Sequence, residues 1–193
     1  MRSLTNIVQR FPTLEHRYDN HIRSVSLGCG PLQSRSEPRL LSVHSGEYIK
    51  EWGRIGNAPG EFRTPHALAF DSQGRLFVAD RGNHRIQIFD QEGEFLAQWT
   101  QFGRPSGIFF DDHGRIFVAD SESDDVQNPG WEMGIRIGEV ATGWVTEFIL
   151  YPWGDPREVA GNGAEFVAVD RDGNLYGGEP RPRRIQKYIR VRP

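Results

Sequence analysis

The sequence contains little cysteine or lysine, and it lacks any long apolar run. Its one cysteine, Cys29, cannot form a disulfide within the chain, so no covalent framework holds the fold. No stretch reaches the roughly 18 apolar residues of a membrane-spanning helix, and the first residues lead into no apolar core like that of a signal peptide. As written, the chain is expected to be cytoplasmic and to have no membrane partner.

The motifs of several common enzyme classes are also absent. There is no G-x-S-x-G nucleophile elbow, P-loop, dinucleotide-binding fingerprint or Cys-pair metal motif, which excludes the usual hydrolases, NTPases and dehydrogenases. Basic residues gather at the two ends of the chain, whereas residues 46–180 are acidic. Because a phosphate backbone is bound by clustered Lys and Arg, nucleic acid is not expected as a partner.

Glycine, proline and aromatic residues are abundant in this chain of 193 residues. It contains 22 Gly, 12 Pro, 12 Phe, 5 Tyr and 5 Trp. This balance favours short aromatic-rich strands joined by tight turns over long helices. The composition therefore predicts an all-β fold, and the length suits one domain with a sizeable core.

Internal repeats define the architecture. Residues 65–80 return without a gap as residues 105–120, and a third copy occupies residues 164–179. A second phrase, residues 46–52, recurs as residues 93–99. Each copy contains an Asp-x-x-Gly turn between apolar runs, as a tight hairpin requires. Because four short strands in about 40 residues form the blade of a propeller, we predict a partial β-propeller of about three four-stranded blades.

The repeats divide the chain into three parts. Residues 1–45 contain no such turn and are expected to be irregular or disordered, with a capping segment as the alternative. Residues 46–190 hold the blades, and residues 191–193 form a tail. A surplus within the second blade predicts an insertion at residues 121–133, which is either a solvated acidic loop or a loop that carries binding groups.

Two phrases carry a family resemblance. Residues 59–68 read P-G-E-F-R-T-P-H-A-L, and residues 78–87 read V-A-D-R-G-N-H-R-I-Q. With them, residues 46–190 resemble NHL-repeat propellers, and more narrowly the bacterial branch similar to peptidyl-α-hydroxyglycine α-amidating lyase. The resemblance implies a six-bladed parent whose channel holds zinc bound by one His from each of three blades, together with a structural calcium, a catalytic Tyr and substrate-binding Arg residues. The implied reaction releases glyoxylate from a peptidyl α-hydroxyglycine.

Few residues of this chain match that site. His66 matches one zinc ligand, and Arg81 matches a substrate-binding Arg. At the place of His66 the second blade has Ser106 and the third has Glu165, which is the second candidate ligand. Zinc sites ordinarily have at least three protein ligands. The residues alone leave open that His66 is a hydrogen-bonded polar residue of the channel, and that Arg81 pairs with a neighbouring acid.

The resemblance thus implies a lyase-like propeller that is incomplete and inactive as this chain and binds a peptide or small molecule in its channel. The alternative is a non-catalytic scaffold that binds a ligand or a protein partner. Three blades leave two open faces, so self-association is also expected. His84 and His113 lie in turn-rich segments and are expected to be solvent-exposed.

Overall fold

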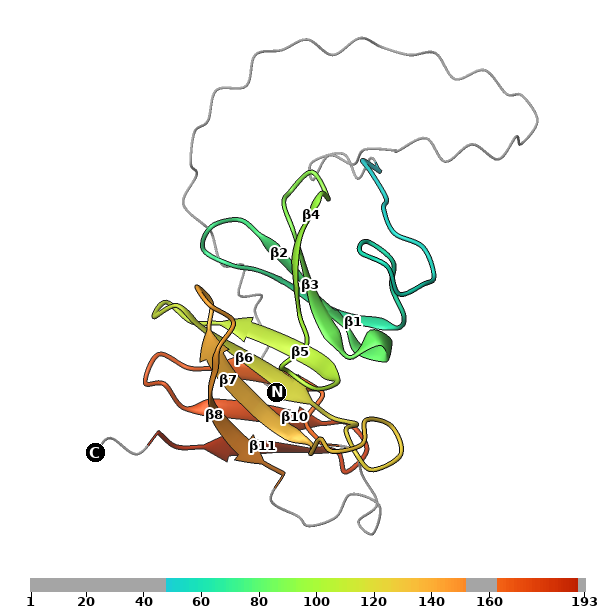
Figure 1. Cartoon of the computed structure of the whole chain (residues 1–193). Helices are drawn as coiled ribbons and strands as arrows, with labels where there is room; N and C mark the ends of the chain where they lie inside the picture. Colours follow the sequence, from blue (N-terminus) through green and yellow to red (C-terminus); the bar gives the residue numbers. More distant parts are fainter. Residues whose placement is uncertain (1–47, 152–162, 191–193) are drawn as a thin grey trace, which may run out of the picture. The chain divides into compact units, whose positions relative to one another are not determined.

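The structure, a computed structural model, describes residues 48–151 and 163–190, all within one compact unit. The segments predicted at residues 1–45 and 191–193 lie outside the described residues. The described ranges form eleven β-strands in three antiparallel sheets, with one 3₁₀ turn at Arg81–Asn83 (Figure 1). The all-β, blade-like fold is therefore confirmed. Within these ranges, no helix has the length and apolar character needed to cross a membrane.

Each sheet is built from strands that follow one another in the chain. The first sheet contains β1 (Pro65–Phe70), β2 (Leu76–Asp80), β3 (Arg85–Phe89) and β4 (Phe95–Trp99). The second contains β5 (Pro105–Phe110), β6 (Arg115–Asp120), β7 (Gly134–Glu139) and β8 (Val145–Leu150). The third contains β9 (Phe166–Val169), β10 (Leu175–Glu179) and β11 (Arg184–Tyr188). The third sheet thus shows three of the four predicted strands within residues 163–190.

An Asp-x-x-Gly turn joins the first two strands of every sheet. In the first sheet, Oδ1 of Asp71 accepts hydrogen bonds from the backbone N–H groups of Gln73 and Arg75, both at 2.9 Å. Gly74 has φ of 75°, a left-handed conformation that glycine adopts without strain. Asp111 and Asp170 accept the same pair of backbone bonds in the other two sheets. The repeated sequence therefore builds a repeated hairpin.

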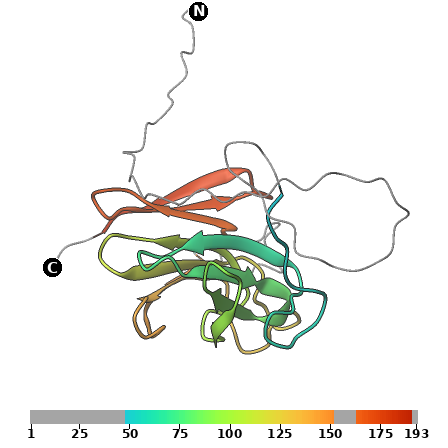
Figure 2. The ribbon, with the colours of Figure 1, turned by 90° about the horizontal axis from the view of Figure 1, so that it is seen from above.

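Two apolar joints hold the sheets together, because alternate side chains of a strand face opposite neighbours. The first joint lies between the first and second sheets and has as its buried core Phe77, Ile86, Ile88, Phe102, Ile116 and Val118. The second joint lies between the second and third sheets and has as its buried core Phe117, Ala119, Ile135, Ile137, Ala164 and Leu175. The leading strands β1, β5 and β9 consequently lie side by side in chain order (Figure 2).

A buried carboxylate at the end of the second strand ties the strands of a sheet together. Asp80, at the end of β2, accepts hydrogen bonds from Nε of Arg85 at 2.8 Å and from the backbone N–H of Arg63 at 2.7 Å. In the third sheet, Glu179 pairs with Arg184 in the same way. Removing one partner of such a buried pair leaves an uncompensated charge, so these contacts strongly constrain the strand ends.

Residues 48–64 lie across part of the face of the first sheet that points away from the second sheet. They contain no strand, but the Trp52 ring lies 6.2 Å from that of Phe89, and the Phe62 ring lies 5.8 Å from it. Lys50 donates a hydrogen bond from Nζ to the backbone carbonyl of Glu92. The segment therefore covers the outer part of this face.

Candidate functional site

The three equivalent positions at the start of the leading strands come together. Nδ1 of His66 donates a hydrogen bond to the backbone carbonyl of Ser106 at 3.1 Å, and its Nε2 lies 3.8 Å from Oε2 of Glu165. Ser106 is buried, and its hydroxyl shares a hydrogen bond of 2.7 Å with that of Ser121. A carbonyl oxygen can only accept, so Nδ1 of His66 carries a proton and Nε2 is the ring atom that faces the carboxylate.

These residues do not fit the zinc centre that the family resemblance implies. His66 and Glu165 supply two candidate donors, and the third position holds Ser106 with its hydroxyl already paired. Within residues 48–151 and 163–190, no group of three or more His, Cys, Asp or Glu side chains could hold a metal ion. A catalytic zinc site ordinarily needs three protein ligands and an open position, so we derive no metal-dependent step for this chain.

Two arginines and one glutamate form a second cluster, at one end of the first joint. Arg81 belongs to the 3₁₀ turn after β2, Arg104 leads into β5, and Glu122 follows β6. Nη2 of Arg104 lies 2.9 Å from Oε2 of Glu122, and Nη1 of Arg81 lies 3.3 Å from Oε1. The two arginine side chains are only 13% and 12% exposed. One carboxylate therefore lies between two largely buried cations.

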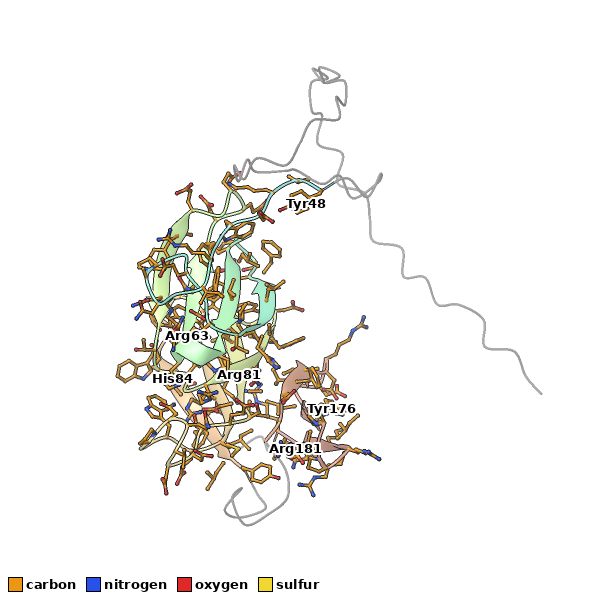
Figure 3. All side chains as sticks on the ribbon, turned by 90° about the vertical axis from the view of Figure 1, so that its right-hand side faces the viewer. Tyr48, Arg63, Arg81, His84, Tyr176 and Arg181 are labelled. Atoms are coloured by element: carbon orange, nitrogen blue, oxygen red, sulfur yellow. The ribbon has the colours of Figure 1, made fainter. Side chains whose placement is uncertain are left out.

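His84 completes this arginine cluster. It has a left-handed backbone with φ of 54°, and its Nε2 accepts a hydrogen bond of 2.9 Å from Nη1 of Arg104. Burial, and next the charge of Arg104, lower the pKa of His84, while Asp120 acts in the opposite direction. An imidazole that accepts from a guanidinium must be neutral at that nitrogen. His84 thus orients Arg104 without adding charge, and Figure 3 shows it near Arg81 at the end of the first sheet.

Asp120, the strand-end carboxylate of the second sheet, holds the backbone of Arg104 in place. Asp120 is fully buried and lies 3.0 Å from Nη1 of Arg136. It also accepts hydrogen bonds from the backbone N–H of Arg104 at 3.1 Å and from the Ser123 hydroxyl at 2.6 Å. Burial raises the pKa of Asp120, whereas these donors and the Arg136 charge lower it. These hydrogen bonds therefore fix the backbone just before β5, and with it the position from which the Arg104 side chain extends.

Three buried donors of the arginine cluster make no hydrogen bond among the described residues, and one of them, Nη1 of Arg81, is ion-paired with Glu122 at 3.3 Å. Nε and Nη1 of Arg81 and Nε of Arg104 are buried and make no hydrogen bond there. Buried donors nearly always have a partner, so these nitrogens mark a candidate binding site. Two arginines, one glutamate and a neutral His84 leave one net positive charge. The arrangement is therefore suited to a small anion.

The structure places the predicted residues at two adjoining clusters. His66 and Glu165 meet at the leading strands, whereas Arg81 pairs with Glu122 in the neighbouring arginine cluster. The prediction that His84 is solvent-exposed is wrong, because it is half-buried against Arg104, a residue of the next sheet's entry loop. His113 is exposed, as predicted.

Sequence reasoning did not single out Arg104 as a functional residue. It placed Glu122 in the acidic insertion at residues 121–133, which forms the connection from β6 to β7, and favoured a solvated loop there over a calcium site. A usable signal was present, because Arg81 and Glu122 lie one and two residues after the repeated Val-Ala-Asp phrase. The two residues therefore leave equivalent strand ends of neighbouring sheets.

Comparison with known proteins gives three findings. Residues 62–89 match the family model of the NHL repeat. The chain is 45% identical over 65 residues to NHL repeat-containing protein 3 of Homo sapiens, an alignment that covers 32% of this chain and 18% of that protein. It is 46% identical over 68 residues to peptidyl-glycine alpha-amidating monooxygenase B of Xenopus laevis, covering 31% of this chain and 8% of that protein.

A solved structure supports the fold. The crystal structure of a protein from Bacteroides fragilis superposes with a TM-score of 0.52 at 14% identity, and the match covers 71% of this chain and 38% of that one. The alignments to the two curated relatives span less than a fifth of either relative's length. The comparisons therefore establish an NHL repeat at residues 62–89, within an all-β fold of propeller-like sheets.

Proposed function

We propose that this chain is a propeller-type binding module whose first joint captures the carboxylate of a peptide or small molecule. The observation that carries this proposal is the set of buried guanidinium nitrogens without a hydrogen-bond partner on Arg81 and Arg104. Similarity to an amidating enzyme over 68 residues supports a lyase-like architecture. The function proposed for the chain itself is binding without catalysis.

The chemistry of the arginine cluster favours a carboxylate. A guanidinium presents two parallel N–H groups that match the two oxygens of a carboxylate, and such charge-assisted pairs are stronger than neutral hydrogen bonds. Both guanidinium groups of the cluster are largely buried, which strengthens their electrostatic attraction for an anion. One bound carboxylate would balance the single net positive charge and supply an acceptor for Nε of Arg81.

The proposal excludes lyase activity on the basis of the donor set. An amidating lyase that uses zinc needs ligands from several blades, and the leading strands of the described sheets offer His66 and Glu165 with Ser106 at the third position. The His66 ring already donates to the backbone carbonyl of Ser106 and lies beside the Glu165 carboxylate, and the Ser106 hydroxyl is paired with that of Ser121. His66 is therefore proposed to position the leading strands, and Arg81 to bind ligand.

Calorimetric titration of the 193-residue chain with two matched peptides tests the proposal. One is an N-acetyl dipeptide ending in a glycine carboxylate, and the other is the same peptide with a C-terminal amide. We expect the carboxylate to bind at least about tenfold more tightly, because only it can pair with Arg81. Arg81→Gln should weaken carboxylate binding by about 10- to 100-fold.

A surface arginine provides the control variant. Arg54 is 82% exposed and pairs with Glu61, so Arg54→Gln removes one positive charge outside the arginine cluster and should leave the affinity unchanged. Equal affinity for the acid and the amide would contradict the carboxylate site. Glyoxylate release from a peptidyl α-hydroxyglycine by the zinc-supplemented chain would contradict the non-catalytic assignment.

A further inference from the structure

The face of the first sheet that points away from the second sheet carries apolar residues of the kind that pack between two sheets, but they are exposed to solvent. Leu68 and Phe70 in β1 are 69% and 58% exposed. Their counterparts in β5 are Ile108 and Phe110, which pack into the first joint. The strand registers are the same, because β1 pairs with β2 as β5 pairs with β6. The first sheet thus repeats the surface by which the second sheet receives its predecessor.

The far face of the third sheet repeats the opposite half of the joint. Ile185 in β11 is 77% exposed and Phe166 in β9 is 61% exposed. The counterparts of Ile185 are Ile86 and Ile135, and both are buried where one sheet packs against the next. The same alignment makes Tyr176 the counterpart of Phe77. Apart from Lys187, which stands where Ile88 is buried in the first joint, the third sheet therefore presents the surface by which the first two sheets contact their successors.

Residues 48–52 occupy the position of an outer strand that belongs to a preceding blade. They repeat the sequence pattern of β4. The Trp52 indole lies against Gly93, where a β-carbon would come within 3.0 Å of it, and the Trp99 indole lies against Gly143 with a corresponding distance of 2.6 Å. Trp52 thus contacts the first sheet as Trp99 contacts the second. No inner strands accompany this outer segment among the described residues.

The third sheet has the complementary deficiency. In the first two sheets, the third strand pairs with an outer strand, β4 or β8. Within residues 163–190, β11 pairs only with β10 and is an open edge. An open edge presents unpaired backbone N–H and C=O groups to a further strand. A segment with the pattern of residues 48–52 is the strand that this sheet lacks.

The charged residues that would face each other if residues 48–52 paired with β11 include one favourable pair and one unfavourable pair. In the first sheet, Nη1 of Arg85 donates a hydrogen bond of 2.8 Å to Oε1 of Gln98. The counterparts of these two residues are Arg184 in β11 and Glu51 in the outer segment. Docking in the repeat register would therefore place an arginine beside a glutamate. It would also place Lys50 opposite Lys187, and this like-charge pair opposes the contact modestly.

We infer that two copies of this chain join head to tail into a closed ring. The third sheet of each copy packs on the first sheet of the other, and residues 48–52 add as a fourth strand to β11 of the second copy. The described residues of two copies then form six four-stranded blades, and each third blade takes its fourth strand from the other copy. Propellers ordinarily have four to eight blades. Closure also buries both open faces and the open edge.

Sedimentation velocity of the 193-residue chain over a micromolar concentration series tests this assembly. We expect a species of twice the chain mass. Leu68→Asp alters only the first-sheet face, and Ile185→Asp alters only the third-sheet face. Because both side chains are exposed in a single copy, each variant should keep its circular dichroism spectrum. Each should raise the dissociation constant of the dimer by about 100-fold, since the joint would bury an unpaired carboxylate.

The matched control variant removes an exposed aromatic residue outside the proposed interface. Trp144 is 71% exposed at the turn before β8, in the sheet whose two faces are already covered. Its counterpart in the first sheet is Glu94, so Trp144→Glu introduces a residue that the repeat already accommodates. This variant should dimerise as the unmodified chain does.

Mixing the two interface variants distinguishes a head-to-tail joint from general stickiness. An Ile185→Asp copy retains an intact first-sheet face, and a Leu68→Asp copy retains an intact third-sheet face. The mixture should therefore form a dimer with one good joint, weaker than the unmodified dimer, whereas either variant alone is monomeric. A monomer at every concentration, an oligomer that keeps growing with concentration, or variants that dimerise normally would each overturn the inference.

Discussion

The first and second joints are built from the same repeat, yet among the residues that the structure describes only the first joint ends in an arginine cluster. After Asp80 the chain continues with Arg81, whereas after Asp120 it continues with Ser121. The carbonyl of Ser121 accepts a backbone hydrogen bond of 3.0 Å from Gly163, which closes the corresponding end of the second joint. The apolar positions thus determine how sheets pack, and the residue after the strand-end carboxylate determines what the end of a joint can bind.

The largest effect on the free energy of unfolding is expected from removing a buried aromatic side chain from either joint. Phe77 is fully buried, with ring centroids 5.3 Å from Trp99 and 4.9 Å from Phe110. Phe117 is its counterpart in the second joint, where the facing core residues of the third sheet are Ala164 and Leu175. Phe77→Ala should lower the free energy of unfolding by about 4–5 kcal/mol, because it loses aromatic contacts as well as apolar burial.

Phe117→Ala provides the comparison for that measurement. It should cost about 3–4 kcal/mol, because the buried core residues that face it, Ala164 and Leu175, are aliphatic and its ring lies 6.3 Å from that of Phe109, farther than the ring contacts of Phe77. Urea unfolding followed by tryptophan fluorescence measures both variants. A Phe117→Ala variant that is less stable than Phe77→Ala would show that the aromatic contacts do not distinguish the two joints.

A smaller effect is expected from the charged end of the first joint. Glu122 is the carboxylate that already contacts both Arg81 and Arg104, so it competes with an external carboxylate for the same donors. Glu122→Gln should tighten binding of the glycine-carboxylate peptide by up to about tenfold, because it removes this competing charge. Calorimetric titration measures the change. Weaker binding by this variant would mean that Glu122 organises the two arginines more than it competes.

Sequence reasoning recovered the repeated parts of the molecule because they depend on local chemistry. The turn at residues 71–74 is specified by the side chain of Asp71 and by Gly74, both within four residues. The same pattern recurs in each sheet. Pairing of Arg81 with a nearby acid was one of the two interpretations that the sequence left open. Such features require no knowledge of how the sheets are staggered.

The missed residues depend on contacts between sheets. His84 lies in a turn, which suggested exposure, but its partner Arg104 is 20 residues further along the chain. Arg104 reaches His84 only because the entry loop of β5 is fixed by Asp120. No periodicity in the sequence records that approach. The candidate site was therefore predictable residue by residue on one sheet, and unpredictable where two sheets meet.

The smallest expected effect is a pH dependence of stability that arises from His84 at the end of the first joint. Burial and Arg104 lower the pKa of His84 in the folded chain, whereas the unfolded chain has an ordinary histidine pKa of about 6.5. The unfolded state therefore binds more protons between these two pKa values, and stability falls as pH decreases through that window. Above about pH 6.5 the contribution of His84 is fully present.

His84→Asn isolates this contribution, because asparagine tolerates the left-handed backbone at position 84 and does not titrate. The unmodified chain should lose more stability than this variant when urea unfolding is compared at pH 7.5 and pH 5.5. Carboxylate affinity should also change less with pH in the variant, since protonation of His84 removes the acceptor that orients Arg104. If His84→Asn shows the same loss of stability as the unmodified chain, the pH dependence arises elsewhere and the two joints do not differ in this respect.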